Sequence, residues 1–303
     1  MKAVKSLVVA LVGCLCIPGN PLRAQDEKPL IQFGLFADAQ YADCEPNINR
    51  YYRKSLPKLE ESINYFNQEK VQFTINLGDI IDRDLADLDT MLTCLKRLDH
   101  KVYHLTGNHD YKGVTDNKVL YKKLNMPSEY YSFEKKKWVF VLLNTNELAS
   151  YANVKGTEKE QELSALRQKI KETGGIQGAS WNGGVSAKQL EWLDKLLAKS
   201  EKSGKRVLIF AHHPLWPKTA FTALNNIEIL DIIDKYSCVK AIFAGHHHTG
   251  EFAYFKDIPV VTAEGMVETE HGNSFGVVKI YNDKIEIEGK GRMTSRVFND
   301  EVK

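Results

Sequence analysis

The residues best suited to chemistry in this chain form five short polar segments, each directly after a short apolar run. In chain order they are Asp38-Ala39-Gln40, Gly78-Asp79-Ile80-Ile81-Asp82-Arg83, Gly107-Asn108-His109-Asp110, His212-His213-Pro214 and Gly245-His246-His247-His248. Alone, each segment has an ordinary explanation as a turn or a helix cap. Together they contain six of the nine histidines of the chain. Such a concentration is hard to explain by chance and indicates one functional site.

The side chains of these segments offer carboxylate and amide oxygens and imidazole nitrogens, but no thiolate. This donor set suits Mn²⁺, Fe²⁺ or Mg²⁺ and disfavours a structural zinc site, which would use cysteine. Asp79 follows a glycine, which lets the backbone turn sharply and bring the carboxylate inward. A carboxylate placed in this way can bridge two cations.

The spacing within two segments predicts which side chains point together. Side chains two residues apart in an extended segment lie on the same side. Asp38 and Gln40 would therefore form one pair, and His246 and His248 another. The middle histidine, His247, would face substrate or solvent instead.

The elements that carry these segments alternate between strands and helices. Short β-branched or aromatic runs predict strands at 31–37, 71–77, 101–106, 138–144, 206–211 and 239–244. Amphipathic stretches predict helices at 49–69, 85–98, 186–200 and 226–236, and the charged stretch 158–173 predicts a solvated helix in an insertion. This order predicts an α/β sandwich with much parallel pairing, in which strand ends converge on one crevice.

Beyond Gly250 the pattern changes to strands alone, near 259–262, 275–281 and 284–288, with Asn282-Asp283 as the turn of a hairpin. No repeat or long linker divides the chain. The simplest organisation is therefore one domain over residues 25–303.

Residues 1–24 differ from the rest of the chain in their pattern of charge and hydropathy. Lys2 and Lys5 precede the apolar run Ser6 to Ile17, and Ala24 stands at a plausible cleavage point. These features are typical of a signal peptide and predict a secreted or periplasmic protein. Lipid attachment at Cys14, which follows Leu11-Val12-Gly13, is an alternative. The three cysteines that would remain, Cys44, Cys94 and Cys238, are too irregularly spaced for a disulfide framework.

The amino-acid composition limits which binding partners the protein can have. The chain has 303 residues, of which 43% are apolar, so it can bury a sizeable core. Lys and Arg number 41 against 39 Asp and Glu, which argues against a nucleic acid polymer as partner. No segment has the roughly twenty apolar residues of a membrane span. The sequence gives no indication of the oligomeric state.

The ordered motifs Asp-x-Gln, Gly-Asp-x-x-Asp-Arg, Gly-Asn-His-Asp, His-x-Pro and Gly-His-x-His resemble those of the calcineurin-like metallophosphoesterases. Within that superfamily the chain is most similar to the manganese-dependent ADP-ribose/CDP-alcohol diphosphatases, because Gln40 replaces the more usual histidine. The stretches FADAQYAD, INLGDIID, NGGVSAKQLEWL and CVKAIFAGHHHTG carry this likeness. The resemblance implies a four-layer α/β/β/α sandwich with two mixed sheets flanked by helices.

The resemblance also implies the site residues. One metal would be held by Asp38, Gln40, Asp79 and His248, and a second by Asp79, Asn108, His212 and His246. Mn²⁺ is the expected metal, with Fe²⁺, Co²⁺ or Mg²⁺ as alternatives. Two such ions can activate a hydroxide and bind the phosphoryl oxygens of the substrate.

His109 would then stabilise or protonate the leaving oxygen, and Asp110 would orient His109. Asp82 and Arg83 are expected to brace their loop by a local ion pair.

The function expected from these features is hydrolysis of phosphoanhydride or phosphodiester bonds in small nucleotide derivatives. A phosphomonoesterase or a cyclic-nucleotide phosphodiesterase is the alternative on the same fold, because the metals do not select the leaving group. A non-catalytic binding protein is a third interpretation, although such a protein should have lost ligands and none is missing here.

Overall fold

The computed structural model describes residues 28–299. The predicted signal peptide, residues 1–24, lies outside this range. Within the described range, no helix combines the length and apolar character needed to cross a bilayer.

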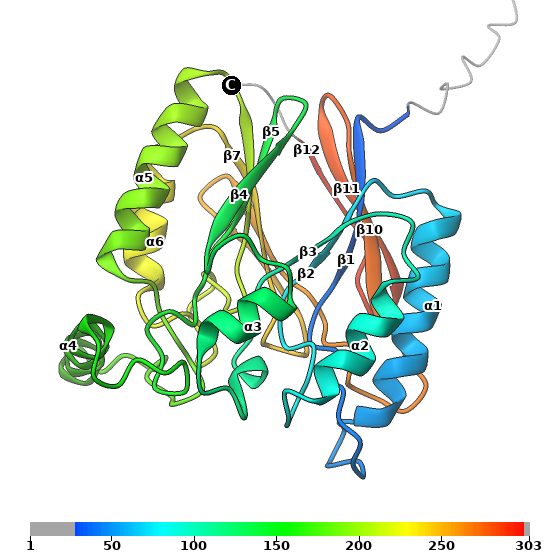
Figure 1. The fold of residues 1–303 in the computed structure, drawn as a ribbon. Coiled ribbons are helices and arrows are strands. Elements are labelled where there is room, and N and C mark those ends of the chain that lie inside the picture. The colour runs from blue at the N-terminus through cyan, green and yellow to red at the C-terminus, as the bar shows by residue number, and fades with distance from the viewer. Residues whose placement is uncertain (1–27, 300–303) are drawn as a thin grey trace, which may run out of the picture.

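Two six-stranded sheets face each other (Figure 1). The first has the order β12-β11-β10-β1-β2-β3, formed by Arg296–Asn299, Lys284–Gly291, Ser274–Ile280, Ile31–Phe36, Thr74–Asn76 and Val102–His104. The second has the order β4-β5-β6-β7-β9-β8, formed by Tyr131–Lys135, Trp138–Leu142, Arg206–Phe210, Val239–Ala244, Ile258–Thr262 and Glu251–Phe255. Each sheet mixes parallel and antiparallel pairs. The predicted mixed sheets are confirmed, whereas β4, β8 and β12 were not anticipated.

Helices cover the outer faces of both sheets (Figure 1). Helices α1 (Ser55–Gln68) and α2 (Asp87–Leu95) lie on the side of the first sheet, and α5 (Ala187–Lys202) and α6 (Asn226–Ile233) on the side of the second. Helices α3 (Asn117–Lys123) and α4 (Glu158–Glu172) lie towards one end, and α3 was not predicted. The four-layer α/β/β/α architecture is therefore confirmed.

The alternation of side chains along β5 shows how the layers are joined. Phe140 belongs to the core cluster between the sheets, whereas Val139 and Val141 pack with residues of α5 and α6 on the other face. Between the sheets, the ring of Phe33 stacks on Phe73 at 5.1 Å and meets Phe140 edge-on at 5.7 Å. Close-packed aromatic rings of this kind fix the relative position of the sheets.

Parallel register brings the strand ends to one edge. Phe36 pairs with Asn76, and Asn76 with His104, so β1, β2 and β3 end level with one another. In the second sheet, Phe210 of β6 pairs with Phe243 of β7. The segments that follow these five strands carry all the polar clusters found in the sequence, and they meet at this edge.

Candidate metal centre

Four of the predicted metal ligands have a left-handed backbone. Their φ angles are 51° for Asp38, 43° for Gln40, 54° for Asp79 and 68° for His246. The expected extended conformation of these segments, on which the pairing of alternate side chains rested, is therefore wrong. A left-handed non-glycine residue costs on the order of 1–3 kcal/mol and persists only where its surroundings hold it. Strain concentrated in this way is typical of a functional site.

Two glycines allow carboxylates to approach the backbone closely. A Cβ atom at Gly107 would lie 2.1 Å from Oδ1 of Asp79, and one at Gly245 would lie 2.8 Å from Oδ2 of Asp38. Any larger residue would displace these carboxylates. The glycines that begin two of the motifs thus have a steric role.

The carboxylate of Asp110 is fully buried and binds backbone rather than side chains. Its Oδ2 accepts hydrogen bonds from the backbone N–H groups of Asp79 at 2.9 Å and Gly107 at 2.8 Å. Its Oδ1 accepts hydrogen bonds from those of Ile80 at 2.9 Å and Ile81 at 3.2 Å. Burial and the nearby Asp79 carboxylate raise the pKa of Asp110, and the N–H donors of Gly107 and Ile81 oppose this rise. The expectation that Asp110 orients His109 is corrected, because both of its oxygens hold the loops after β2 and β3.

The carboxylate beside His109 is Asp82. Nδ1 of His109 lies 2.9 Å from Oδ1 of Asp82 and 3.2 Å from the Asp82 carbonyl oxygen. Asp82 also lies 3.4 Å from Arg83, as the expected local ion pair requires, and 3.8 Å from Arg50. Burial lowers the pKa of His109, but Asp79 and Asp82 outweigh it and raise the pKa above its usual value. Asp82 therefore favours a protonated His109 as well as bracing its loop.

Asp79 lies at the centre of the cluster. Its Oδ2 accepts a hydrogen bond from Nε2 of Gln40 at 3.0 Å and lies 3.5 Å from Nε2 of His212, while its Oδ1 accepts the backbone N–H of His109 at 2.7 Å. Burial alone would raise the pKa of Asp79, but the imidazoles of His212 and His109 bring it well below its usual value. The position suits a carboxylate shared by two cations.

Two histidines present the same nitrogen to the cluster. Nδ1 of His212 donates to the carbonyl oxygen of Leu77 at 2.9 Å, which leaves Nε2 beside Asn108 Oδ1 at 3.2 Å. Nδ1 of His248 lies 2.8 Å from Oε1 of Glu268, which leaves Nε2 at 3.5 Å from Oδ1 of Asp38. Hydrogen bonding on one side of the ring fixes the tautomer that a metal ligand needs.

The charges of these two rings follow their surroundings. Burial lowers the pKa of both imidazoles, but Asp79 beside His212 and Asp38 beside His248 raise each to about 9. The cluster therefore attracts positive charge, which protons or cations can supply.

The remaining histidines divide into one predicted ligand and two others. Nε2 of His246 lies 3.0 Å from Oδ1 of Asn182, and its backbone N–H donates to Asp38. His213 uses both ring nitrogens, at 2.8 Å from Thr145 Oγ1 and 3.2 Å from the Trp181 carbonyl. Burial and the neighbouring His212 lower the pKa of His213 to about 3, so it is neutral.

His247 points away from the cluster, as its middle position in the triplet had suggested. Its ring stacks on Phe221 with centroids 4.4 Å apart, and its Nε2 lies 3.0 Å from Thr249 Oγ1. The structure thus brings the predicted ligands of the five segments together and leaves His213 and His247 in other roles.

Gln40 provides a test of whether cations fit this cluster. Its amide nitrogen donates to Asp79, but its Oε1 is buried without a hydrogen-bond partner among residues 28–299. Leaving such an acceptor unsatisfied costs about 1–3 kcal/mol. Asp38, Asp79 and His212 also offer ligand atoms within 4.8 Å of one another. An orphaned oxygen beside converging O and N donors fits a divalent cation.

A cavity of about 670 Å³ opens onto the cluster. It is lined by Gln40, Arg50, Asp79, Asn108, His109, Lys112, Ser150, Tyr151, Ser180, Trp181, Phe221, His246 and His248. The volume is that of a typical small-ligand site.

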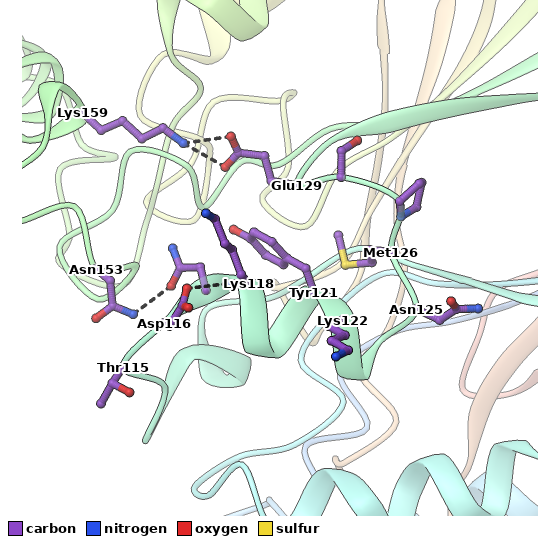
Figure 2. Close-up of a pocket in the computed structure, with 13 residues that line it drawn as sticks. Thr115, Asp116, Lys118, Tyr121, Lys122, Asn125, Met126, Glu129, Asn153 and Lys159 are labelled. Carbon is purple, nitrogen blue, oxygen red and sulfur yellow. Dashed lines mark hydrogen bonds and ion pairs between the residues drawn. The ribbon is translucent and has the colours of Figure 1, made fainter.

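A larger cavity of about 740 Å³ lies along α3 and the segment that leads to β4 (Figure 2). Several of its polar side chains are paired: Lys159 with Glu129 at 2.8 Å, and Asn153 with Asn117 at 2.8 Å. None of the predicted ligands lines it. The chemistry is therefore assigned to the smaller cavity.

Several residues of the site escaped the sequence analysis. Arg50, Lys112 and Trp181 line the cavity, Asn182 contacts His246, and Glu268 contacts His248. Of the aromatic residues near the motifs, Tyr151 and Phe221 line the cavity, whereas Tyr52 is buried. The sequence signal for Trp181 and Asn182 was the stretch NGGVSAKQLEWL, which begins at Asn182, whereas Glu268 had none.

Comparisons with known proteins agree with this geometry. Residues 31–250 match the family model described as calcineurin-like phosphoesterase. Proteins named manganese-dependent ADP-ribose/CDP-alcohol diphosphatase are similar: the one from Bos taurus is 31% identical over 93% of this chain and 98% of its own length. The one from Homo sapiens is 32% identical over 92% of this chain and 96% of its own length.

A solved structure is also similar. The crystal structure of a dimetal phosphatase from Danio rerio superposes with a TM-score of 0.84 at 28% identity, covering 90% of this chain and 100% of that one.

Replacement of Asp110 tests its role as an anchor of the loops. In Asp110→Asn, the amide NH₂ would face backbone N–H groups, so we expect the free energy of unfolding to fall by about 3 kcal/mol or more. Urea unfolding of the metal-free protein measures this loss. Asp231→Asn, an exposed change on α6, is the control and should stay within about 0.5 kcal/mol of wild type. Equal stability of both variants would contradict the anchoring role.

Proposed function

Because this chain belongs to the calcineurin-like phosphoesterase family, and is thus a metal-dependent hydrolase, we propose that it cleaves the diphosphate of small nucleotide derivatives of the ADP-ribose or CDP-alcohol type. The observation that carries the proposal is the convergence of seven side chains with O and N donors, including the orphaned Gln40 oxygen. Five of them line one cavity: Gln40, Asp79, Asn108, His246 and His248. The names of the relatives, manganese-dependent ADP-ribose/CDP-alcohol diphosphatases, support the substrate class.

The residues present would hold two divalent cations, with Mn²⁺ as the working metal. We assign Asp38, Gln40, Asp79 and His248 to one ion, and Asp79, Asn108, His212 and His246 to the other. When bound, such ions activate water and neutralise phosphoryl charge. The chain's own residues hold these donors in place. Nδ1 of His212 donates to the Leu77 carbonyl oxygen, and Nδ1 of His248 lies against Oε1 of Glu268.

His109 is assigned to the leaving group. Asp82 lies against its Nδ1, and the ring lines the cavity, so Nε2 is left for the substrate. A protonated imidazole in this position can donate its proton to the departing oxygen. Asp82 keeps the ring oriented and favours its charged form.

The walls of the cavity support a nucleotide derivative. Arg50 and Lys112 bring positive charge, which suits a substrate with two phosphates. Tyr151, Trp181 and Phe221 offer aromatic surface, which suits a base. A site that accepted only a single small phosphate would not need both features.

Metal removal and a substrate panel test the proposed function. Chelated, metal-free protein should be inactive, and Mn²⁺ should restore hydrolysis of ADP-ribose and CDP-choline because the donors hold the ions in place. The release of nucleoside monophosphate is measured by chromatography, with 2′,3′-cyclic AMP and p-nitrophenyl phosphate as comparison substrates. Preference for either comparison substrate would favour the alternative function, and full activity after proven metal removal would refute the two-metal assignment.

His109→Ala tests the proton donor. Turnover should fall roughly 10²–10⁴-fold while both metals remain bound. The defect should be larger for substrates with a poor, alkoxide-like leaving group than for p-nitrophenyl phosphate, which needs little protonation. Metal content and rates on two such substrates are the measurements. A lost metal with the same defect on every substrate would show that His109 only supports the Asn108 loop.

We also propose that the enzyme is exported. The support is the sequence of residues 1–24, with its two lysines, apolar run and small residue at the cleavage point. Expressed in a bacterial host, the full chain should appear outside the cytoplasm with Gln25 as its first residue. Mass spectrometry of the fractionated protein reads this directly, and an intact Met1 chain in the cytoplasm would refute the proposal. Lipid attached to Cys14 would instead support the alternative processing.

A further inference from the structure

Glu268 lies in the segment between β9 and β10, and its side chain is 10% exposed. We propose that Glu268 is a positioning residue for His248, and that the buried Lys58 of α1 holds the segment from which Glu268 acts. The inference rests on the proposed function in one respect, because it takes His248 to be a metal ligand.

The first step is the contact itself. Oε1 of Glu268 lies 2.8 Å from Nδ1 of His248. An ionised carboxylate accepts hydrogen bonds and donates none. Beside a neutral imidazole, Glu268 therefore keeps the proton on Nδ1 and leaves the lone pair on Nε2. Nε2 is the nitrogen on the side of Asp38, at 3.5 Å. Glu268 therefore selects the tautomer in which His248 can bind a cation next to Asp38.

The second step is that the carboxylate of Glu268 is itself fixed. Its Oε2 accepts a hydrogen bond from the side-chain amide of Asn49. The backbone of Glu268 forms a bridge with Arg50, and the N–H of Thr269 donates to the Asn49 carbonyl at 2.9 Å. Both oxygens and the backbone are thus held, which leaves the carboxylate little freedom to leave the imidazole.

The third step concerns Lys58, which is 5% exposed. Its ammonium donates to three carbonyl oxygens, of Met266 at 2.9 Å, Glu268 at 2.9 Å and Thr269 at 2.7 Å. A buried cation is costly unless its donors are used, and packing of α1 alone would be served by an apolar residue. The placement of Lys58 is explained if the segment around Glu268 must be held in one conformation.

The same segment also bonds the backbone around Asp38, the second ligand of this ion. The N–H groups of Met266 and Val267 donate to the carbonyls of Ala37 and Asp38, both at 3.0 Å. Arg292 donates to the carbonyls of Gly265 at 2.7 Å and His248 at 3.1 Å. Residues 265–269 therefore connect two ligands of the same ion, Asp38 and His248, through backbone and carboxylate together.

Calorimetric titration of the metal-free protein with Mn²⁺, in the absence of substrate, tests the inference. Wild type should bind two ions. Glu268→Ala should weaken one of them by roughly 10–100-fold and leave the other near its wild-type affinity. Glu268→Gln should weaken it less, because the amide oxygen still accepts from Nδ1. Glu264→Gln is the matched control, since Glu264 lies in the same segment but bonds Thr294, and its two affinities should be unchanged.

A second readout separates positioning from a general structural role. At about pH 10, where most of the metal-free protein has a neutral His248, nitrogen-15 NMR of the imidazoles should report the Nδ1–H tautomer for His248 in wild type and its loss in Glu268→Ala. The thermal midpoint of metal-free Glu268→Gln should stay close to wild type, because the side-chain amide of Asn49 can rotate so that its oxygen accepts from the new NH₂ group. Lys58→Met should weaken the same ion as Glu268→Ala, and the double variant should add little to either single effect, as coupled residues do.

Wild-type affinity for both ions in Glu268→Ala would overturn the inference. So would an equal loss of both ions together with a lowered thermal midpoint in Glu268→Gln, because that pattern describes a misfolded segment. A wild-type chain that binds two Mn²⁺ but cleaves neither ADP-ribose nor CDP-choline would refute the proposed substrate class and leave this inference standing. A wild-type chain that binds fewer than two would overturn both.

Discussion

The carboxylate of Asp110 is the contact on which the metal centre depends. Its four backbone N–H partners come from the loops after two parallel strands, so one buried side chain holds Asp79 and Gly107 in fixed relation. Asp79 has a left-handed backbone, which the chain would not keep without such an anchor. Once Asp79 is placed, Gln40, His109 and His212 all take their positions from its two oxygens.

Around this anchor the molecule accommodates its buried charges in two different ways. Asp79 and Asp38 are matched by imidazoles, whose pKa values rise in response, and this charge can equally be matched by divalent cations. The buried cation Lys58 bonds carbonyl oxygens of the neighbouring segment instead. The hydrogen bonds of the Lys58 ammonium thus go to backbone carbonyl oxygens and not to the ligand carboxylates, where this cation would compete with the metals. At a metal concentration 100 times the dissociation constant, each bound ion would stabilise the fold by about 2.7 kcal/mol.

Much of this arrangement could be predicted from the sequence, because it depends on local patterns. The apolar runs predicted the central strands, and polar residues directly after them predicted the ligands. Asp110 was assigned wrongly because it is next to His109 in the chain, whereas in the short 3-10 turn His109–Tyr111 the two side chains take different partners. Glu268 was missed because its partners, Asn49 and His248, are 219 and 20 residues away. The left-handed ligands were missed because long-range contacts, not residue type, impose that backbone.

The pairing of β1 with β10 sets the order in which this protein can be built. β1 lies in the middle of its sheet, yet one of its two neighbours is β10, Ser274–Ile280, near the opposite terminus. β1 is synthesised well before β10, so its second edge stays uncovered until residues 274–280 have been made. The donors at Asp38 and His248, with Glu268, are separated in the same way. An incomplete chain therefore exposes a strand edge on which chaperones or aggregation can act, and it cannot yet bring Asp38 and His248 together.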